Sequence, residues 1–228
     1  LKLEGQMIGR HPEYHLDHRL LLNAIDYKAK TVTIDGTTYP LKDGHFPTID
    51  PAHPYALTPE ESSLMDSLVY SFTHSDVLKK HIEFFFTNGS MYKVINGNLL
   101  FHGCIPMNED GSFATVETLE GPYSGKALMD YFERKARQAY FSQDVYATDI
   151  FYYLWCGPAS PLFGKDKMST FEHCLIEDVK THVENYNAYY SLSKQEEYAD
   201  LILKEFGIDP QTGHIVNGHV PVKVKKGE

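Results

Sequence analysis

Two glycine-containing turns constrain the fold of this chain most strongly. Asp35-Gly36 lies between the segments TVTI and TTYPL, and Asn96-Gly97 lies between MYKVI and NLLFH. Such pairs between apolar, β-prone segments favour tight hairpin turns, because both central residues must adopt positive φ. The sequence therefore predicts two β-hairpins, and the second places His102 at the end of its outgoing strand.

Helices are expected between and after these hairpins, from apolar spacing and from capping residues. The expected helices cover 13–25, a segment from Pro59, a segment from Ser75 to Asn88, a segment from Ser124 to about Tyr140, 145–155, and segments opened by capping boxes at Ser169 and Ser193. The segment 145–155 is apolar on nearly all sides, so we expect a buried helix there. Further strands are expected at FATVETL and at the C-terminal IVNGHVP. Helices and hairpins alternate without a run of βαβ units, which predicts an α/β or layered α+β fold rather than a Rossmann sheet.

Composition narrows the classes of partner. The 228 residues carry a net charge of −10, which argues against a surface that binds a nucleic-acid backbone. No apolar run reaches the length that a membrane span needs, so we expect no membrane contact. Cys104, Cys156 and Cys174 lack metal-site spacing, and their odd number favours a reducing, cytoplasmic setting.

Two histidines beside glycines are the main candidates for chemistry. The stretch LLFHGCIP ends an apolar strand at His102-Gly103, and IVNGHVP places Gly218-His219 at the end of the last strand. A strand end aims a side chain rigidly, and a neutral imidazole is a good ligand for manganese, zinc or iron. Two such histidines could be two arms of one metal site. Histidines that are hydrogen-bonded in place for structural reasons are the alternative.

Two glycine–lysine turns are candidates for phosphate binding. Gly164-Lys165 and Gly125-Lys126 each precede a helix, where backbone N–H groups and an ammonium suit an anion, although neither is a Walker A loop. We take Lys165 and Lys167 as candidate substrate-binding residues, with Lys126 as a weaker one.

Other polar residues have ordinary structural interpretations. His11, His15 and His18 are interpreted as a polar helix start rather than a metal site. Asp149 could orient a ligand histidine, but a satisfied buried position explains it equally. The tyrosines of ENYNAYY either pack or stack on a sugar. Cys104 is interpreted as a small buried residue.

A family resemblance adds to these observations. LLFHGCIP and NGHVP resemble the fourth and fifth signatures of the calcineurin-like metallophosphoesterases. FHGCIPMNEDGSF, YLWCGPASPLFGKDKMSTFE and TGHIVNGHVPVKVKKGE resemble the class III fructose-1,6-bisphosphatases, and the similarity runs over essentially the whole chain.

The resemblance implies a fold, a reaction and a cofactor. It implies part of an αββα sandwich, with a mainly helical insertion over 113–212 between the two histidine-bearing strands. The implied reaction is metal-dependent hydrolysis of the 1-phosphate of fructose 1,6-bisphosphate to fructose 6-phosphate, a gluconeogenic step of carbohydrate metabolism. His102 and His219 would hold one ion of a two-metal centre. Mn²⁺ or Mg²⁺ is implied, and two imidazoles favour Mn²⁺.

The chain also departs from the superfamily pattern. The signatures Asp-x-His, Gly-Asp-x-x-Asp and Gly-Asn-His should precede the fourth one, but only Asp43-Gly44-His45 matches, in a proline-rich connector. We therefore interpret 1–228 as a single domain segment from inside a longer metallophosphoesterase, and the catalytic residues stay unknown. The alternatives are another calcineurin-like enzyme, such as a protein phosphatase, or a non-catalytic interaction domain. The sequence leaves open whether the protein is a homo-oligomer.

Overall fold

The computed structural model describes residues 1–142 and 144–220, which form two compact units. The first unit combines Leu1–Gly89 with Ser169–Val183, and the second combines Ser90–Met168 with the chain from Glu184 onward. The single domain segment that the sequence predicts stays a prediction.

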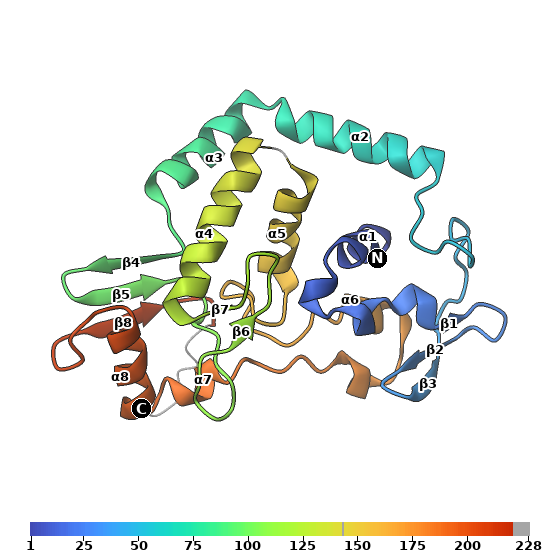
Figure 1. The fold of residues 1–228 in the computed structure, drawn as a ribbon. Helices are drawn as coiled ribbons and strands as arrows, with labels where there is room; N and C mark the ends of the chain where they lie inside the picture. Colours follow the sequence, from blue (N-terminus) through green and yellow to red (C-terminus); the bar gives the residue numbers. More distant parts are fainter. Residues whose placement is uncertain (143, 221–228) are drawn as a thin grey trace, which may run out of the picture. The chain divides into compact units, whose positions relative to one another are not determined.

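The first unit holds a small sheet and several short helical segments. Its elements are α1 (Lys2–Arg10), η1 (Pro12–Tyr14), η2 (Asp17–Arg19), η3 (Leu21–Ala24), β1 (Ile25–Asp26), β2 (Thr31–Ile34), β3 (Thr37–Pro40), α2 (Pro59–Thr73), α3 (Asp76–Asn88), α6 (Thr170–Leu175) and η4 (Val179–His182) (Figure 1). Strands β1, β2 and β3 form an antiparallel sheet in that order, which confirms the first predicted hairpin.

The capping prediction at α2 is also confirmed. The backbone N–H of Glu61 donates to Thr58 Oγ1 over 3.2 Å, and the backbone N–H of Thr58 donates to Glu61 Oε2 over 2.9 Å. This reciprocal pair satisfies two donors that the start of a helix leaves without partners. At α3, Ser75 accepts from the backbone N–H of Leu78 in the same way.

A buried ion pair stands beside the core of the first unit. The Glu172 side chain is 0% exposed and accepts two bonds from Arg19, at 2.6 Å from Nη1 and 3.2 Å from Nη2. Glu172 lies in α6, next to Phe171 of the hydrophobic cluster. The pair therefore fixes α6 to the η2 turn, which is more than 150 positions earlier in the sequence.

Two predictions for the first unit are wrong in detail. The segment 13–25 is not a helix but a series of 3₁₀ turns, because His15 takes a left-handed φ of 52° that interrupts helical geometry. Its apolar residues are nevertheless buried, as Leu16 and Leu21 show. At α6, the Ser169 hydroxyl makes no cap bond and donates instead to the carbonyl of His182.

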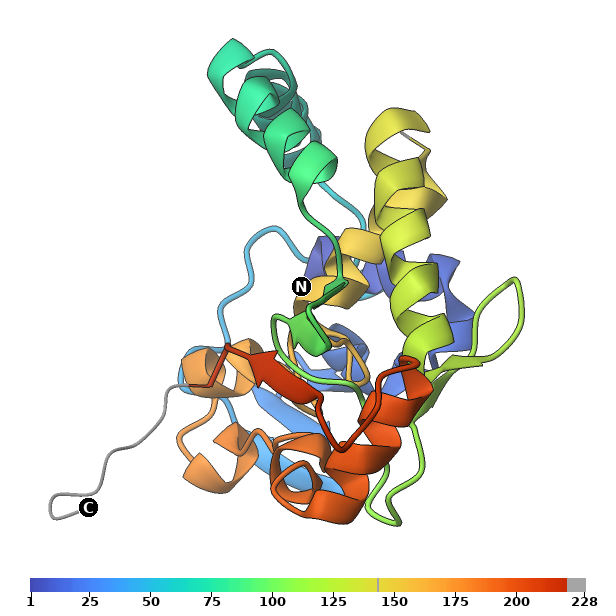
Figure 2. The same ribbon diagram turned by 90° about the vertical axis from the view of Figure 1, so that its left-hand side faces the viewer.

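The second unit contains the second hairpin and the longest helix. Its elements are β4 (Tyr92–Ile95), β5 (Asn98–Phe101), β6 (Thr115–Val116), β7 (Tyr123–Ser124), α4 (Gly125–Ser142), α5 (Val145–Cys156), α7 (Tyr189–Leu192), α8 (Glu196–Glu205) and β8 (His214–Asn217). Helices α4 and α5 run side by side in both views (Figures 1 and 2).

The sheet of the second unit determines where the candidate histidines lie. Its strand order is β4-β5-β8 (Figure 1). The β4–β5 pair is the predicted antiparallel hairpin, whereas β8 pairs with β5 in parallel, with Phe101 opposite Asn217. Parallel neighbours end at the same edge of a sheet. The residues after β5 and after β8 therefore leave the sheet side by side.

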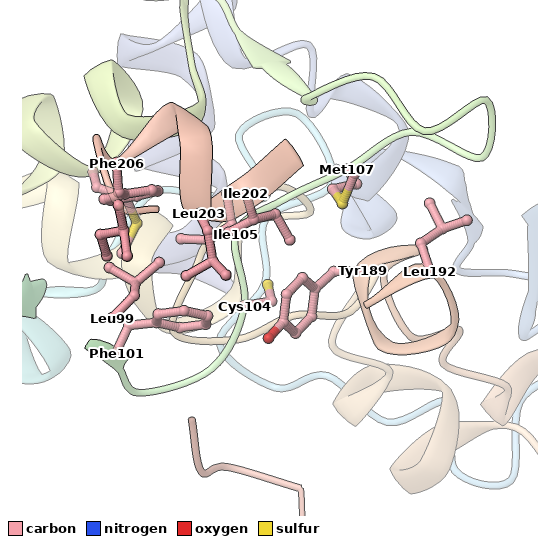
Figure 3. Close-up of a cluster of buried hydrophobic side chains, with 12 residues drawn as sticks. Leu99, Phe101, Cys104, Ile105, Met107, Tyr189, Leu192, Ile202, Leu203 and Phe206 are labelled. Carbon is pink, nitrogen blue, oxygen red and sulfur yellow. The ribbon is translucent and has the colours of Figure 1, made fainter. Parts of the chain in front are cut away.

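A hydrophobic cluster anchors this edge of the sheet. It contains Leu99 and Phe101 of β5 and Cys104, and its other members come from the following loop, from α4, α7 and α8, and from the segment just after α8 (Figure 3). The Phe101 ring packs edge-on against Tyr189, with 5.9 Å between the ring centroids. His102 therefore lies between anchored residues on both sides.

Three predictions for the second unit need correction. The expected strand FATVETL is reduced to β6. Helix α5 is half-exposed rather than buried, because Ile150 and Leu154 face the core while Trp155 is 63% exposed. Helix α8 begins after Gln195 instead of at the proposed Ser193 capping box.

The described chain confirms the predicted α/β class, with helices and small mixed sheets in one polypeptide. The αββα sandwich and the insertion over 113–212 stay predictions. Among the described residues, none of the helices combines the length and the apolarity that crossing a membrane requires.

The buried ion pair yields a stability prediction. Arg19→Ala should lower the free energy of unfolding by about 3 kcal/mol, because it leaves the Glu172 carboxylate buried without its guanidinium. Lys79→Ala, which removes an exposed i,i+4 pair with Glu83, should change it by less than about 0.5 kcal/mol. Urea unfolding followed by circular dichroism measures both. Equal, small effects would show that the buried pair does not hold α6.

Candidate metal centre

The two histidines singled out in the sequence meet in the structure. His102 Nε2 lies 3.0 Å from His219 Nδ1, although 117 positions separate the residues along the chain. The ring centroids are 4.9 Å apart and the ring planes are inclined by 72°. Two imidazole nitrogens therefore point at one another from neighbouring strand ends.

Backbone contacts hold the two strand ends together. The N–H of Gly218 donates to the carbonyl of His102 over 2.9 Å, and Asn217 Nδ2 donates to the carbonyl of Gly103 over 2.8 Å. His219 itself follows β8 rather than lying within it, with a left-handed φ of 67°. Non-glycine residues rarely adopt this conformation, and it is found where surrounding structure imposes it. Here it accompanies the turn of the imidazole toward His102.

The loop GPASPLFGK closes the site from a third segment of the chain. The N–H of Cys104 donates to the carbonyl of Pro161 over 3.0 Å. A Cβ atom on Gly103 would overlap that same carbonyl oxygen, so the close approach of the loop requires glycine here. Buried Ser160 shapes the loop, because its Oγ accepts from the N–H groups of Leu162 and Phe163.

The loop also fixes the tautomer of His219. His219 Nε2 lies 3.1 Å from the carbonyl oxygen of Phe163. A carbonyl can only accept, so Nε2 must carry the proton and Nδ1 must present its lone pair to His102. Metal-binding histidines commonly donate their other ring N–H to a backbone carbonyl in this way.

The electrostatics of the site favour the neutral imidazole of His102. Burial lowers the pKa of His102, and the neighbouring His219 lowers it further. Cys104 is fully buried, and burial raises the pKa of its thiol to about 12. The thiol is therefore protonated at neutral pH. Cys104 is a small buried residue that packs in the core, as the sequence predicted.

The donor set fits part of a metal site. Two converging imidazole nitrogens suit a divalent transition metal. Within residues 1–142 and 144–220, however, no group of three or more histidine, cysteine, aspartate or glutamate side chains is placed to hold an ion. Val220 is the last described residue of the motif, and Pro221 and the residues after it lie outside the described chain.

The lysine candidates have defined surroundings. Lys165 follows Phe163 by two positions and pairs with Glu184 over 2.7 Å. Lys126 pairs with Asp130 one helical turn away on α4. Lys167 lies half-buried on the same loop as Lys165.

The remaining candidates are not gathered at the histidine pair. His11 is buried and bonded to Glu13 at 2.8 Å in the first unit, where His15 and His18 lie on separate short turns. Asp149 is buried within α5. The sequence did not point to the Phe163 carbonyl, because a backbone oxygen leaves no side-chain signature.

The tautomer assignment predicts a spectroscopic result. In ¹⁵N-labelled protein at neutral pH without metal, His219 should show a protonated Nε2 and an unprotonated Nδ1, because Phe163 accepts from Nε2. Long-range ¹H–¹⁵N spectra distinguish the two nitrogens, and His45, an exposed connector histidine, serves as the comparison. A protonated Nδ1 on neutral His219 would contradict the arrangement.

Three curated relatives that align with the whole chain carry the same name. The class 3 fructose-1,6-bisphosphatase of Clostridium tetani is 52% identical over 232 aligned residues, and that of Clostridium botulinum is 50% identical. The class 3 enzyme of Parabacteroides distasonis is also 50% identical. Each alignment covers 100% of this chain and 35% of the relative, so the chain spans about a third of the length of these relatives.

No solved structure matches the chain. The family model described as Firmicute fructose-1,6-bisphosphatase matches residues 1–228. The resemblance carried by three motifs, two around the candidate histidines and one in the loop GPASPLFGK, therefore extends from one end of the sequence to the other. The chain belongs to the Firmicute fructose-1,6-bisphosphatase family.

Proposed function

We propose that this chain supplies His102 and His219 as two ligands of one divalent metal ion in a fructose-1,6-bisphosphatase. The observation that carries the proposal is the 3.0 Å approach of His102 Nε2 to His219 Nδ1. Nε2 of His219 is at the same time hydrogen-bonded to the Phe163 carbonyl. The relatives' names support the substrate, since each is called a class 3 fructose-1,6-bisphosphatase.

The proposed reaction is hydrolysis of the 1-phosphate of fructose 1,6-bisphosphate, which gives fructose 6-phosphate and phosphate. When bound, a divalent ion supplies Lewis-acid activation of water and neutralises phosphoryl charge. The role of this chain is to fix His102 Nε2 and His219 Nδ1 at one point, 3.0 Å apart, where both could ligate the ion. The Phe163 carbonyl holds the His219 proton away from the ligating side.

The ion we propose is Mn²⁺ in preference to Mg²⁺, because imidazole nitrogen suits manganese better than magnesium. The further ligands, and the second metal of a two-metal centre, are proposed to come from residues outside the described set. We also propose a gluconeogenic role in the cytoplasm. Homo-oligomers are compatible with this proposal.

Metal binding tests the role of the histidines. His102→Ala and His219→Ala should each weaken Mn²⁺ binding to this chain more than about tenfold, since each removes a ligand. Titration calorimetry measures the affinity, and His45→Ala is the matched control that should leave it unchanged. Binding that survives both ligand substitutions would overturn the assignment.

Turnover tests whether these residues suffice. The purified 228-residue chain should hydrolyse fructose 1,6-bisphosphate only slowly with Mn²⁺, because two histidines do not complete a two-metal site. Released phosphate measures the rate. Robust turnover that depends on His102 would show that this chain holds a full catalytic centre.

A further inference from the structure

A second cluster of side chains lies on the loop that contacts His219. Lys165 Nζ is 2.7 Å from Glu184 Oε2, and the two side chains are 26% and 21% exposed. The ammonium also lies 5.5 Å from the centroid of the Tyr186 ring and 5.9 Å from that of Phe163. One cation therefore stands between a carboxylate and two aromatic rings, two positions after the carbonyl that orients His219.

Backbone pairing holds this cluster in place. Lys165 and Tyr186 form an isolated antiparallel bridge. The Asp166 carboxylate accepts from both the backbone N–H and the side-chain amide of Asn185, over 2.9 Å and 2.6 Å. Asn187 donates its N–H to the Gly164 carbonyl over 2.9 Å. The loop GPASPLFGK and the segment ENYN are thus joined on both sides of the Lys165–Glu184 pair.

Asn187 links this pair of segments to the strand end that carries His102. Its Oδ1 accepts from the N–H of Met107 over 2.9 Å, and Met107 follows His102 by five positions. The cluster and the two histidines therefore share one supporting framework within the second unit.

The surroundings of the lysine suit a sugar phosphate. The rings and the carboxylate keep Lys165 charged, and the bond to Glu184 raises the pKa of its ammonium. Tyr186 is 55% exposed, so its ring is open to a ligand beside the ammonium. Aromatic faces pack well on sugar rings, and an ammonium binds phosphate strongly.

We propose that Lys165 and Tyr186 form the subsite for the phosphate and sugar of fructose 6-phosphate, and that Glu184 occupies the ammonium when this ligand is absent. This inference rests on the proposed bisphosphatase function. Glu184 acts as an internal competitor, because its carboxylate and the phosphate bind the same cation. Tyr186 then contacts the sugar, and Lys165 contacts the phosphate that is not hydrolysed.

If Glu184 competes with the ligand, removing its charge should raise the affinity for the ligand. Glu184→Gln should tighten binding of fructose 6-phosphate about threefold, since it removes the competing charge. Lys165→Met should weaken binding about tenfold or more, because it removes a charge-assisted bond. Tyr186→Leu should weaken fructose 6-phosphate about threefold and leave inorganic phosphate unchanged. NMR titration of the metal-free chain with each of the two probes measures these changes.

The controls use an exposed ion pair on α3. Lys79→Met and Glu83→Gln alter a pair whose side chains are 64% and 52% exposed, and they should leave both affinities unchanged. Weaker binding in Glu184→Gln, no effect of Lys165→Met, or an equal loss in Lys79→Met would each overturn the subsite. Absence of fructose 6-phosphate binding in every variant would do so as well. Because no metal is present, these results do not depend on the Mn²⁺ titration, and either proposal can fail alone.

Discussion

The parallel pairing of β5 with β8 is the interaction on which the rest of the candidate site depends. The ladder ends with Phe101 opposite Asn217, and it brings together two segments that are separated by most of the second unit. A shift of one residue in this register would move every following side chain to the other face. The buried Leu99 and Phe101, packed among α7 and α8, oppose such a shift because it would expose them (Figure 3). The histidine pair is thus a consequence of how the core fixes the sheet.

The loop after α5 also holds the two histidine-bearing strand ends in place. Its carbonyls at Pro161 and Phe163 receive N–H groups from the residue after Gly103 and from His219, so one loop contacts both strand ends. Ser160, with no exposed surface, holds the loop from within. The same loop continues into Lys165 and the ENYN segment. Metal binding and the proposed recognition of the sugar phosphate would therefore be supported by one set of backbone contacts.

The sequence indicated some of this arrangement and could not indicate the rest. Asn96-Gly97 and the apolar strand predicted where His102 would lie, because turn chemistry and alternation are local. The parallel pairing that brings His102 to His219 joins distant strands and leaves no local pattern in the sequence. The expectation that the two histidines meet came from the family signatures. The expected helix over 13–25 fails because apolar spacing describes which residues are buried, not the backbone that buries them. The Phe163 carbonyl and the Glu184 partner of Lys165 depend on tertiary contacts, which spacing does not report.

The central claim is that His102 and His219 share one cation, and anomalous scattering tests it most directly. Crystals of the chain grown with Mn²⁺ and measured at the manganese edge should show a peak bonded to both His102 Nε2 and His219 Nδ1, with His219 Nε2 still donating to Phe163. A manganese peak elsewhere, with the two imidazoles still in direct contact at about hydrogen-bond distance, would contradict the account. The histidine pair would then be a structural hydrogen bond at the edge of the sheet.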